Sequence, residues 1–340
     1  MARLDRDPKI LALAADLGLD PRRNPVAEIV GYCSRRVESW LPRDAPPGTV
    51  GELEAIVCGR LGLVFEEIHE DADLDRVIRD YVSKGDVIFA TAKYALDNWT
   101  LGLLYERRHA RGKPDQYVAR IDCRGEEKNA RRFFTRWHEI AHLLILPPWA
   151  APPFTREPEE RCPIERLVDI VAGEIGFYGP VFRPKLERCV AHHGTLSYRA
   201  IEDLRAAYCP EASFHATAIA AVKAYDRPAI LVEARRAWKK HEDNTQPPKL
   251  RAVTVMMNAP ARAIGLRIDW NMAVPDDSVI AHAFRIGDES VVTGVENLST
   301  WRHSNGASLP DADVVIDASS TPDRAIAIVT LRTSAKLEGS

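Results

Sequence analysis

The residues with the clearest chemical potential form the pentapeptide His138-Glu139-Ile140-Ala141-His142. Positions four apart lie on one face of a helix, so both imidazoles can meet a single metal ion. Neutral imidazole nitrogens suit zinc, and a carboxylate beside the ion can take a proton from water. An isolated pair of histidines is more often part of a core, so a third ligand has to be found.

A second pattern supplies that ligand. In one group of zincins the third ligand comes from a second helix as Glu-x-x-x-Asp, and Glu165-Arg-Leu-Val-Asp169 follows His142 by 23 residues. Glu165 is predicted to bind the metal, and Asp169 to accept the N–H of a ligand histidine and fix its tautomer. On their own, acids at this spacing would form a solvated helix face. Three further acids compete as third ligand from a proline-rich loop over 149–158 and just beyond it: Glu157, Glu159 and Glu160.

The elements that must position these residues follow from hydrophobic periodicity. The first motif is expected on a helix over 128–145 and the second on a helix over 164–177. Further helices are predicted within the first forty residues, over 51–61, twice within 201–225, and through Trp238. Strands are predicted at 63–65, 86–90, 116–122, 252–256, 263–268, 279–286, 291–295, 314–316 and 325–331.

This order predicts an α+β chain in several parts. They are an N-terminal helical extension (1–48), a mainly helical zincin-like domain with a small sheet (49–190), a helical segment (195–242) and a β-rich C-terminal domain (250–335).

Composition limits the class of protein. The 340 residues carry 46 Lys and Arg against 49 Asp and Glu, a net charge of −3, which excludes a binder of nucleic acid recognised by net charge alone. No apolar run approaches the roughly 18 residues needed to span a bilayer, so a cytoplasmic protein without a membrane partner is expected. The 6 cysteines include no Cys-x2-Cys pair. We therefore expect reduced, mostly buried cysteines and no zinc knuckle.

Both motifs together resemble a known family. The run Arg-Phe-Phe-Thr-Arg-Trp-His-Glu-Ile-Ala-His-Leu-Leu (132–144), followed by Glu-Arg-Leu-Val-Asp-Ile-Val-Ala (165–172), is similar to the ImmA/IrrE metallopeptidases. The similarity is specific over about 128–180. Val168 and Val171 stand where the family favours Ala and Phe, as in a divergent member.

The resemblance implies a zinc endopeptidase of the gluzincin type. His138, His142 and Glu165 would hold Zn²⁺, for which Mn²⁺ is also suited, and Glu139 would act as the base. It further implies a narrow protein substrate, typically a helix-turn-helix repressor whose cleavage releases stress-response or mobile-element genes. It also implies a helix-turn-helix-like segment over 195–242 and a GAF-like domain after 250.

A donor that stabilises the oxyanion is expected as well. Nothing in the sequence selects among three candidates: Tyr178, His192 and His193. The bland interpretation of the histidine pair, a surface turn before Gly194, is favoured.

The alternative function is a catalytically silent metal-binding sensor or a DNA-associated regulator. In it a helix pair within 197–240 would read DNA, with four basic side chains on phosphates: Arg235, Arg236, Lys239 and Lys240. A solvated basic helix end is the favoured interpretation of those four residues. Glu139 argues for the enzyme, because a silent scaffold needs no base beside its metal.

Overall fold

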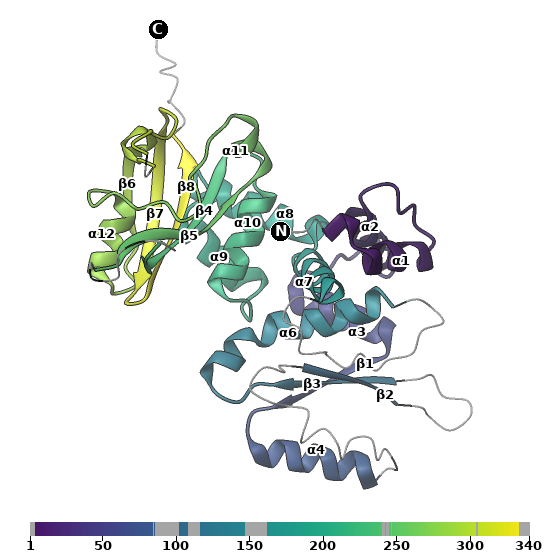
Figure 1. Cartoon of the computed structure of the whole chain (residues 1–340). Helices are drawn as coiled ribbons and strands as arrows, with labels where there is room; N and C mark the ends of the chain where they lie inside the picture. Colours follow the sequence, from purple (N-terminus) through teal and green to yellow (C-terminus); the bar gives the residue numbers. More distant parts are fainter. Residues whose placement is uncertain are drawn as a thin grey trace. The chain divides into compact units, whose positions relative to one another are not determined.

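The computed structural model describes residues 4–83, 85, 102–107, 116–146, 162–239, 242, 245, 247–303 and 305–332. The chain is α+β and forms two compact units (Figure 1). The first unit comprises Met1–Val181 with Tyr208–Ser213, and the second Phe182–Ala207 with Phe214–Ser340. None of the described helices is both long and apolar enough to cross a bilayer.

The first unit combines helices with a small sheet. Its helices are α1 (Pro8–Asp16), α2 (Pro25–Glu38), α3 (Val50–Leu61), α4 (Asp71–Ser83), α6 (Glu126–Leu144) and α7 (Pro163–Gly176). Its strands are β1 (Leu63–Ile68), β2 (Gly102–Arg107) and β3 (Gln116–Asp122). The strand order is β1-β3-β2, with β1 parallel and β2 antiparallel to β3.

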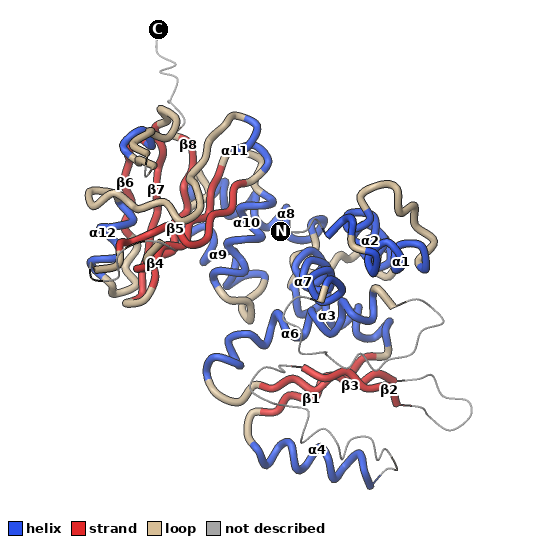
Figure 2. The backbone as a smooth tube through the Cα atoms, viewed as in Figure 1, coloured by secondary structure: helices blue, strands red, loops and turns tan. Residues whose placement is uncertain are grey.

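Helices cover both faces of this sheet. Figure 2 shows α4 below the strands and α3 and α6 above them. On the α4 side, Leu74, Val77 and Tyr81 pack against Ile68 and Val118 in one apolar cluster. Successive side chains of a strand point to opposite faces. The residues that alternate with Ile68 and Val118 therefore face α6, the helix that carries the first motif.

Three contacts fix α6 in place. Trp137, 1% exposed, packs against Gly176, where an added Cβ would lie 3.0 Å from Cγ of the indole. The glycine therefore lets α7 approach α6 closely. Arg36 of α2 donates to the carbonyls of Leu143 and Leu144 at 3.4 and 3.2 Å, satisfying acceptors that a helix C-terminus leaves unpaired. Arg136 pairs with Glu54 and with Glu67, the latter at 2.7 Å.

The second unit is a five-stranded antiparallel sheet with helices. Its helices are α8 (Gly179–His193, from Phe182 onward), α9 (Tyr198–Tyr208, to Ala207), α10 (Phe214–Ala224), α11 (Ala259–Ala263) and α12 (Val279–Ile286). Its strands are β4 (Ala229–Ala237), β5 (Lys249–Met257), β6 (Val292–Asn297), β7 (Asp313–Thr321) and β8 (Arg324–Leu331), in the order β5-β4-β8-β7-β6.

Three predicted elements of this unit are wrong. The helix expected through Trp238 is strand β4, whose residues 229–234 are buried between β5 and β8. The strand expected at 279–286 is helix α12, capped by Ser278 and by Gly287 at φ 67°. The strand expected at 263–268 starts on the last residue of α11 and continues as a turn and irregular chain. A short apolar run fits both the periodicity of a helix and that of a strand, so its burial in the folded chain decides which of the two forms.

Other predictions agree with the structure or lie outside it. Helices α1, α2, α3, α6, α7, α9 and α10 and strands β1, β3, β5, β6, β7 and β8 occur where the pattern predicts them, whereas α4, β2 and α8 were not predicted. The helical segment predicted over 195–242 contains α9 and α10 but ends in β4. The strand predicted at 86–90 and the loop at 149–158 lie outside the described residues, and the domain boundaries remain predictions.

The contact between α6 and α7 can be tested by Gly176→Ala. The added methyl group meets a buried ring that cannot move away, so the free energy of unfolding should fall by about 1–3 kcal/mol in denaturant titrations. Gly173→Ala on the same helix is the matched control, because nothing lies within 4 Å of its Cβ position. It should be neutral or stabilising by up to about 1 kcal/mol. Equal effects of the two variants would contradict close packing at Gly176.

Candidate metal centre

The two histidines of the first motif lie one turn apart on α6. His138 and His142 are 6% and 5% exposed, and their ring centroids are 4.8 Å apart. Helix α6 begins after Gly125, at φ 79°, and carries Glu126 and Glu127 in its first turn, where acids favour the helix dipole. The helix that the spacing required is therefore present, and both imidazoles are turned away from solvent.

Glu165 reaches the same point from the first turn of α7. Its Oε2 lies 3.1 Å from Nε2 of His138, and its Oε1 lies 3.6 Å from Nε2 of His142. The two Nε2 atoms are 3.2 Å apart. Pro163 occupies the start of α7. It has no backbone N–H, but an N–H at this position would have no partner within the helix, so the proline begins the helix without the loss of a hydrogen bond.

These distances fit a tetrahedral ion. Zinc binds nitrogen and oxygen at about 2.0–2.2 Å, so two ligand atoms of a tetrahedron lie about 3.4 Å apart. The separation of the two Nε2 atoms falls close to that value, and so do the distances from the two oxygens of Glu165, Oε2 to His138 and Oε1 to His142. His138, His142 and Glu165 can therefore hold one divalent cation and leave a fourth position open.

Asp169 sets the chemistry of the first histidine. Its Oδ1 lies 2.9 Å from Nδ1 of His138, and an Nδ1–H donated to this carboxylate leaves Nε2, on the side of Glu165, as the atom that can bind a metal ion. Burial lowers the pKa of His138, but the carboxylates of Asp169 and Glu165 outweigh it and raise this pKa to about 9. Burial acts to raise the pKa of Glu165, yet both imidazoles hold it well below its usual range.

Glu139 lies beside the cluster, in contact with strand β2. Its side chain is buried, and Gly102 at the start of β2 lies against it. A Cβ at Gly102 would clash with Oε1 of Glu139 and lie 3.1 Å from Cγ2 of Thr135. Sequence reasoning missed Gly102; the signal was a glycine opening the apolar run Gly-Leu-Leu-Tyr, where a backbone often approaches another group closely.

The predicted oxyanion donors lie in different places. Tyr178 follows α7 and is buried, and burial together with the carboxylate of Glu38 raises its pKa. His192 and His193 end helix α8 in the second unit and do not form a surface turn. Nε2 of His193 lies 2.7 Å from Oδ2 of Asp203. The oxyanion role of all three residues stays a prediction.

The three competing third ligands lie outside the described residues: Glu157, Glu159 and Glu160.

Comparison with known proteins adds a distant similarity to solved structures. No protein-family model matches the chain, and no curated protein matches its sequence. Among solved structures it is similar to a transcriptional regulator of Mycobacterium tuberculosis, with 12% identity over 96% of this chain and 81% of that chain, and a TM-score of 0.43. No function is inferred from a similarity this distant.

The role of Asp169 can be tested by Asp169→Asn. Losing the carboxylate that orients His138 should raise the zinc Kd by about 10–100-fold. Zinc affinity is measured by competition with a fluorescent zinc chelator. Only the zinc binding that is lost in His138→Ala is counted, because that binding belongs to the cluster on α6 and α7. Glu174→Gln is the matched control on the exposed far end of α7. If both variants changed the affinity equally, the effect would come from net charge and not from orientation.

Proposed function

We propose that this chain is a zinc-dependent endopeptidase and a divergent member of the ImmA/IrrE family. The observation that carries the proposal is the convergence of His138, His142 and Glu165 with separations of 3.1–3.6 Å, with Glu139 on the same helix. Three ligands and an open position characterise catalytic zinc, whereas structural zinc takes four protein ligands. Mn²⁺ suits the same ligands.

Each residue has a distinct task. When bound, zinc would polarise the scissile carbonyl and make a water molecule acidic. Glu139 takes a proton from the attacking water and returns it to the nitrogen of the leaving amine. Asp169 keeps Nδ1 of His138 protonated, so that Nε2 stays available as a ligand.

Strand β2 is the element best suited to hold the substrate. It is an edge strand of its sheet, because among the described strands its only partner is β3. An extended peptide added to its other side would form main-chain hydrogen bonds. Such a peptide would run past Gly102 and therefore past the carboxylate of Glu139.

The substrate we propose is a protein, following the family resemblance: a helix-turn-helix repressor in the cytoplasm, cleaved to start a stress or mobile-element response. The antiparallel sheet of the second unit is compatible with the GAF-like domain that the same resemblance predicts.

Glu139→Gln tests the enzymatic role. The amide keeps the size of the side chain but cannot accept the proton, so cleavage should fall by about 10²–10⁴-fold while zinc binding is retained. The zinc-loaded chain and the variant are incubated with a native lysate of the producing cells. New protein amino termini are then labelled and identified by mass spectrometry.

Two outcomes would contradict the proposal. Cleavage that persists in Glu139→Gln would show that Glu139 is not the general base of the reaction. No cleavage by either protein, with duplex DNA binding that weakens steeply with salt, would favour the regulator.

The basic residues expected on phosphates do not form a helix end: Arg235 and Arg236 lie on strand β4, and Lys240 lies outside the described residues. Both arginines also have partners within the chain. Arg235 pairs with Glu233 at 2.5 Å, and Arg236 lies over the ring of Phe284.

The close contact between β2 and Glu139 gives a second test. Gly102→Ala should push the carboxylate away from its position, and a displacement of about 1 Å can reduce turnover by about 10²-fold. Zinc binding should be unchanged. Gly59→Ala, at an exposed helical glycine with nothing within 4 Å of its Cβ position, serves as control. The measurement is the cleavage rate of a peptide spanning a site identified above, and full activity of Gly102→Ala would show that the contact does not position Glu139.

A further inference from the structure

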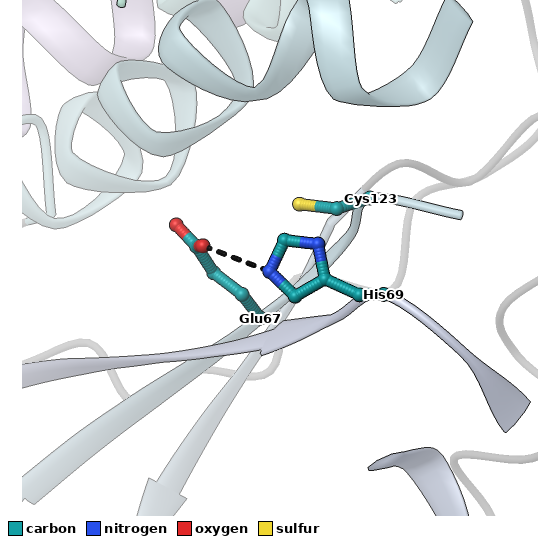
Figure 3. Close-up of side chains that lie close together, drawn as sticks. All are labelled: Glu67, His69 and Cys123. Atoms are coloured by element: carbon teal, nitrogen blue, oxygen red, sulfur yellow. Dashed lines mark ion pairs between the residues drawn. The ribbon is translucent and has the colours of Figure 1, made fainter. Parts of the chain in front are cut away.

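A second group of ligand-type side chains lies at the carboxyl ends of β1 and β3. The two strands are parallel neighbours in register, with Glu67 opposite Ile121 and Ile68 opposite Asp122. The chain therefore leaves both strands side by side, which places His69 next to Cys123. Figure 3 shows the side chains of Glu67, His69 and Cys123 turned toward one another.

The three side chains are close enough to share one ion. Oε2 of Glu67 lies 3.4 Å from Nε2 of His69, which is about the separation of two ligands on a tetrahedral zinc ion. One atom from each residue, the carboxylate oxygen, the imidazole nitrogen and Sγ, lies within 4.8 Å of the others. His69 is exposed, so its ring can rotate to bring its nitrogen nearer to Sγ of Cys123 and the carboxylate of Glu67.

The main chain at this point is held in place. Asp73 in the first turn of α4 accepts hydrogen bonds from the backbone N–H groups of His69 and Glu70, at 3.1 and 3.3 Å. The N–H of Cys123 donates to the carbonyl of Ile68 at 2.8 Å. The backbone that carries two of the three ligands is therefore set by the fold before any ion binds.

The carboxylates and guanidinium groups around Glu67 have a net negative charge, which favours a cation. Glu67 accepts hydrogen bonds from Arg132 at 3.2 Å and from Arg136 at 2.7 Å. Each arginine also pairs with a second carboxylate, Arg132 with Glu211 at 3.2 Å and Arg136 with Glu54. Three carboxylates thus face two guanidinium groups, which leaves one negative charge before the thiol is considered.

Cys123 supplies the element that determines which metal fits. Its thiol is buried, and burial, with the carboxylate of Glu67, raises the pKa of this thiol to about 11. A metal that binds sulfur must displace that proton. Thiolate and imidazole ligands favour zinc over magnesium or calcium, which prefer oxygen.

We propose that Glu67, His69 and Cys123 form a second zinc site, separate from the cluster on α6 and α7. Zn²⁺ binds through one carboxylate oxygen, Nε2 of His69 and Sγ of Cys123. The thiol proton passes to solvent, and a water molecule completes the coordination on the exposed side of His69. The bound ion joins the ends of β1 and β3, the strands against which α6 packs. This site does not depend on the proposed peptidase activity.

Cobalt distinguishes the two sites, because a thiolate ligand gives Co²⁺ a charge-transfer absorption in the near ultraviolet that nitrogen and oxygen ligands do not give. The full chain, reduced and freed of metal, is titrated with Co²⁺. We expect this absorption in the wild type and in His138→Ala, and its loss in Cys123→Ser. Zinc bound per chain should fall from about two to about one in Cys123→Ser.

Two further variants keep the test decisive. His69→Ala changes an exposed side chain and should weaken the absorption without affecting folding. Cys58→Ser alters another cysteine of the same unit and should leave the absorption intact. No charge-transfer absorption in the folded wild type, or its persistence in Cys123→Ser, would overturn the proposal. Loss in Cys123→Ser with retention in His138→Ala would support it whether or not the chain cleaves peptides.

Discussion

The constraint on which the candidate centre depends is the mutual approach of three atoms that all carry lone pairs. Nε2 of His138, Nε2 of His142 and a carboxylate oxygen of Glu165 face one point in a largely buried setting. Such atoms repel one another unless a proton or a cation lies between them. The raised pKa of His138 reflects the proton, and a divalent ion of the right size would replace it.

The position of α6 decides whether these atoms can meet. The helix is held by α7 through Trp137 and Gly176, by α2 through Arg36, and by the sheet through Arg136, whose guanidinium also lies over the ring of Phe65. Arg36 contacts the carbonyls directly after His142, so α2, near the start of the chain, supports the helix that carries both histidines.

Sequence reasoning reached the parts of the site that local patterns encode. The spacing of His138 and His142, and of Glu165 and Asp169, fixes which side chains share a helix face, so two short motifs were enough to predict the cluster. It missed Gly102 and Cys123, because their roles depend on which strands pair with which and on what packs against them. The misassigned segment 279–286 has the same cause: only burial distinguishes a short apolar helix from a strand.

The most direct test is anomalous diffraction at the zinc edge from crystals grown with zinc. We predict an anomalous peak at about 2.0–2.2 Å from Nε2 of His138, from Nε2 of His142 and from a carboxylate oxygen of Glu165. A well-ordered α6 and α7 with no anomalous density between these three residues would contradict the account.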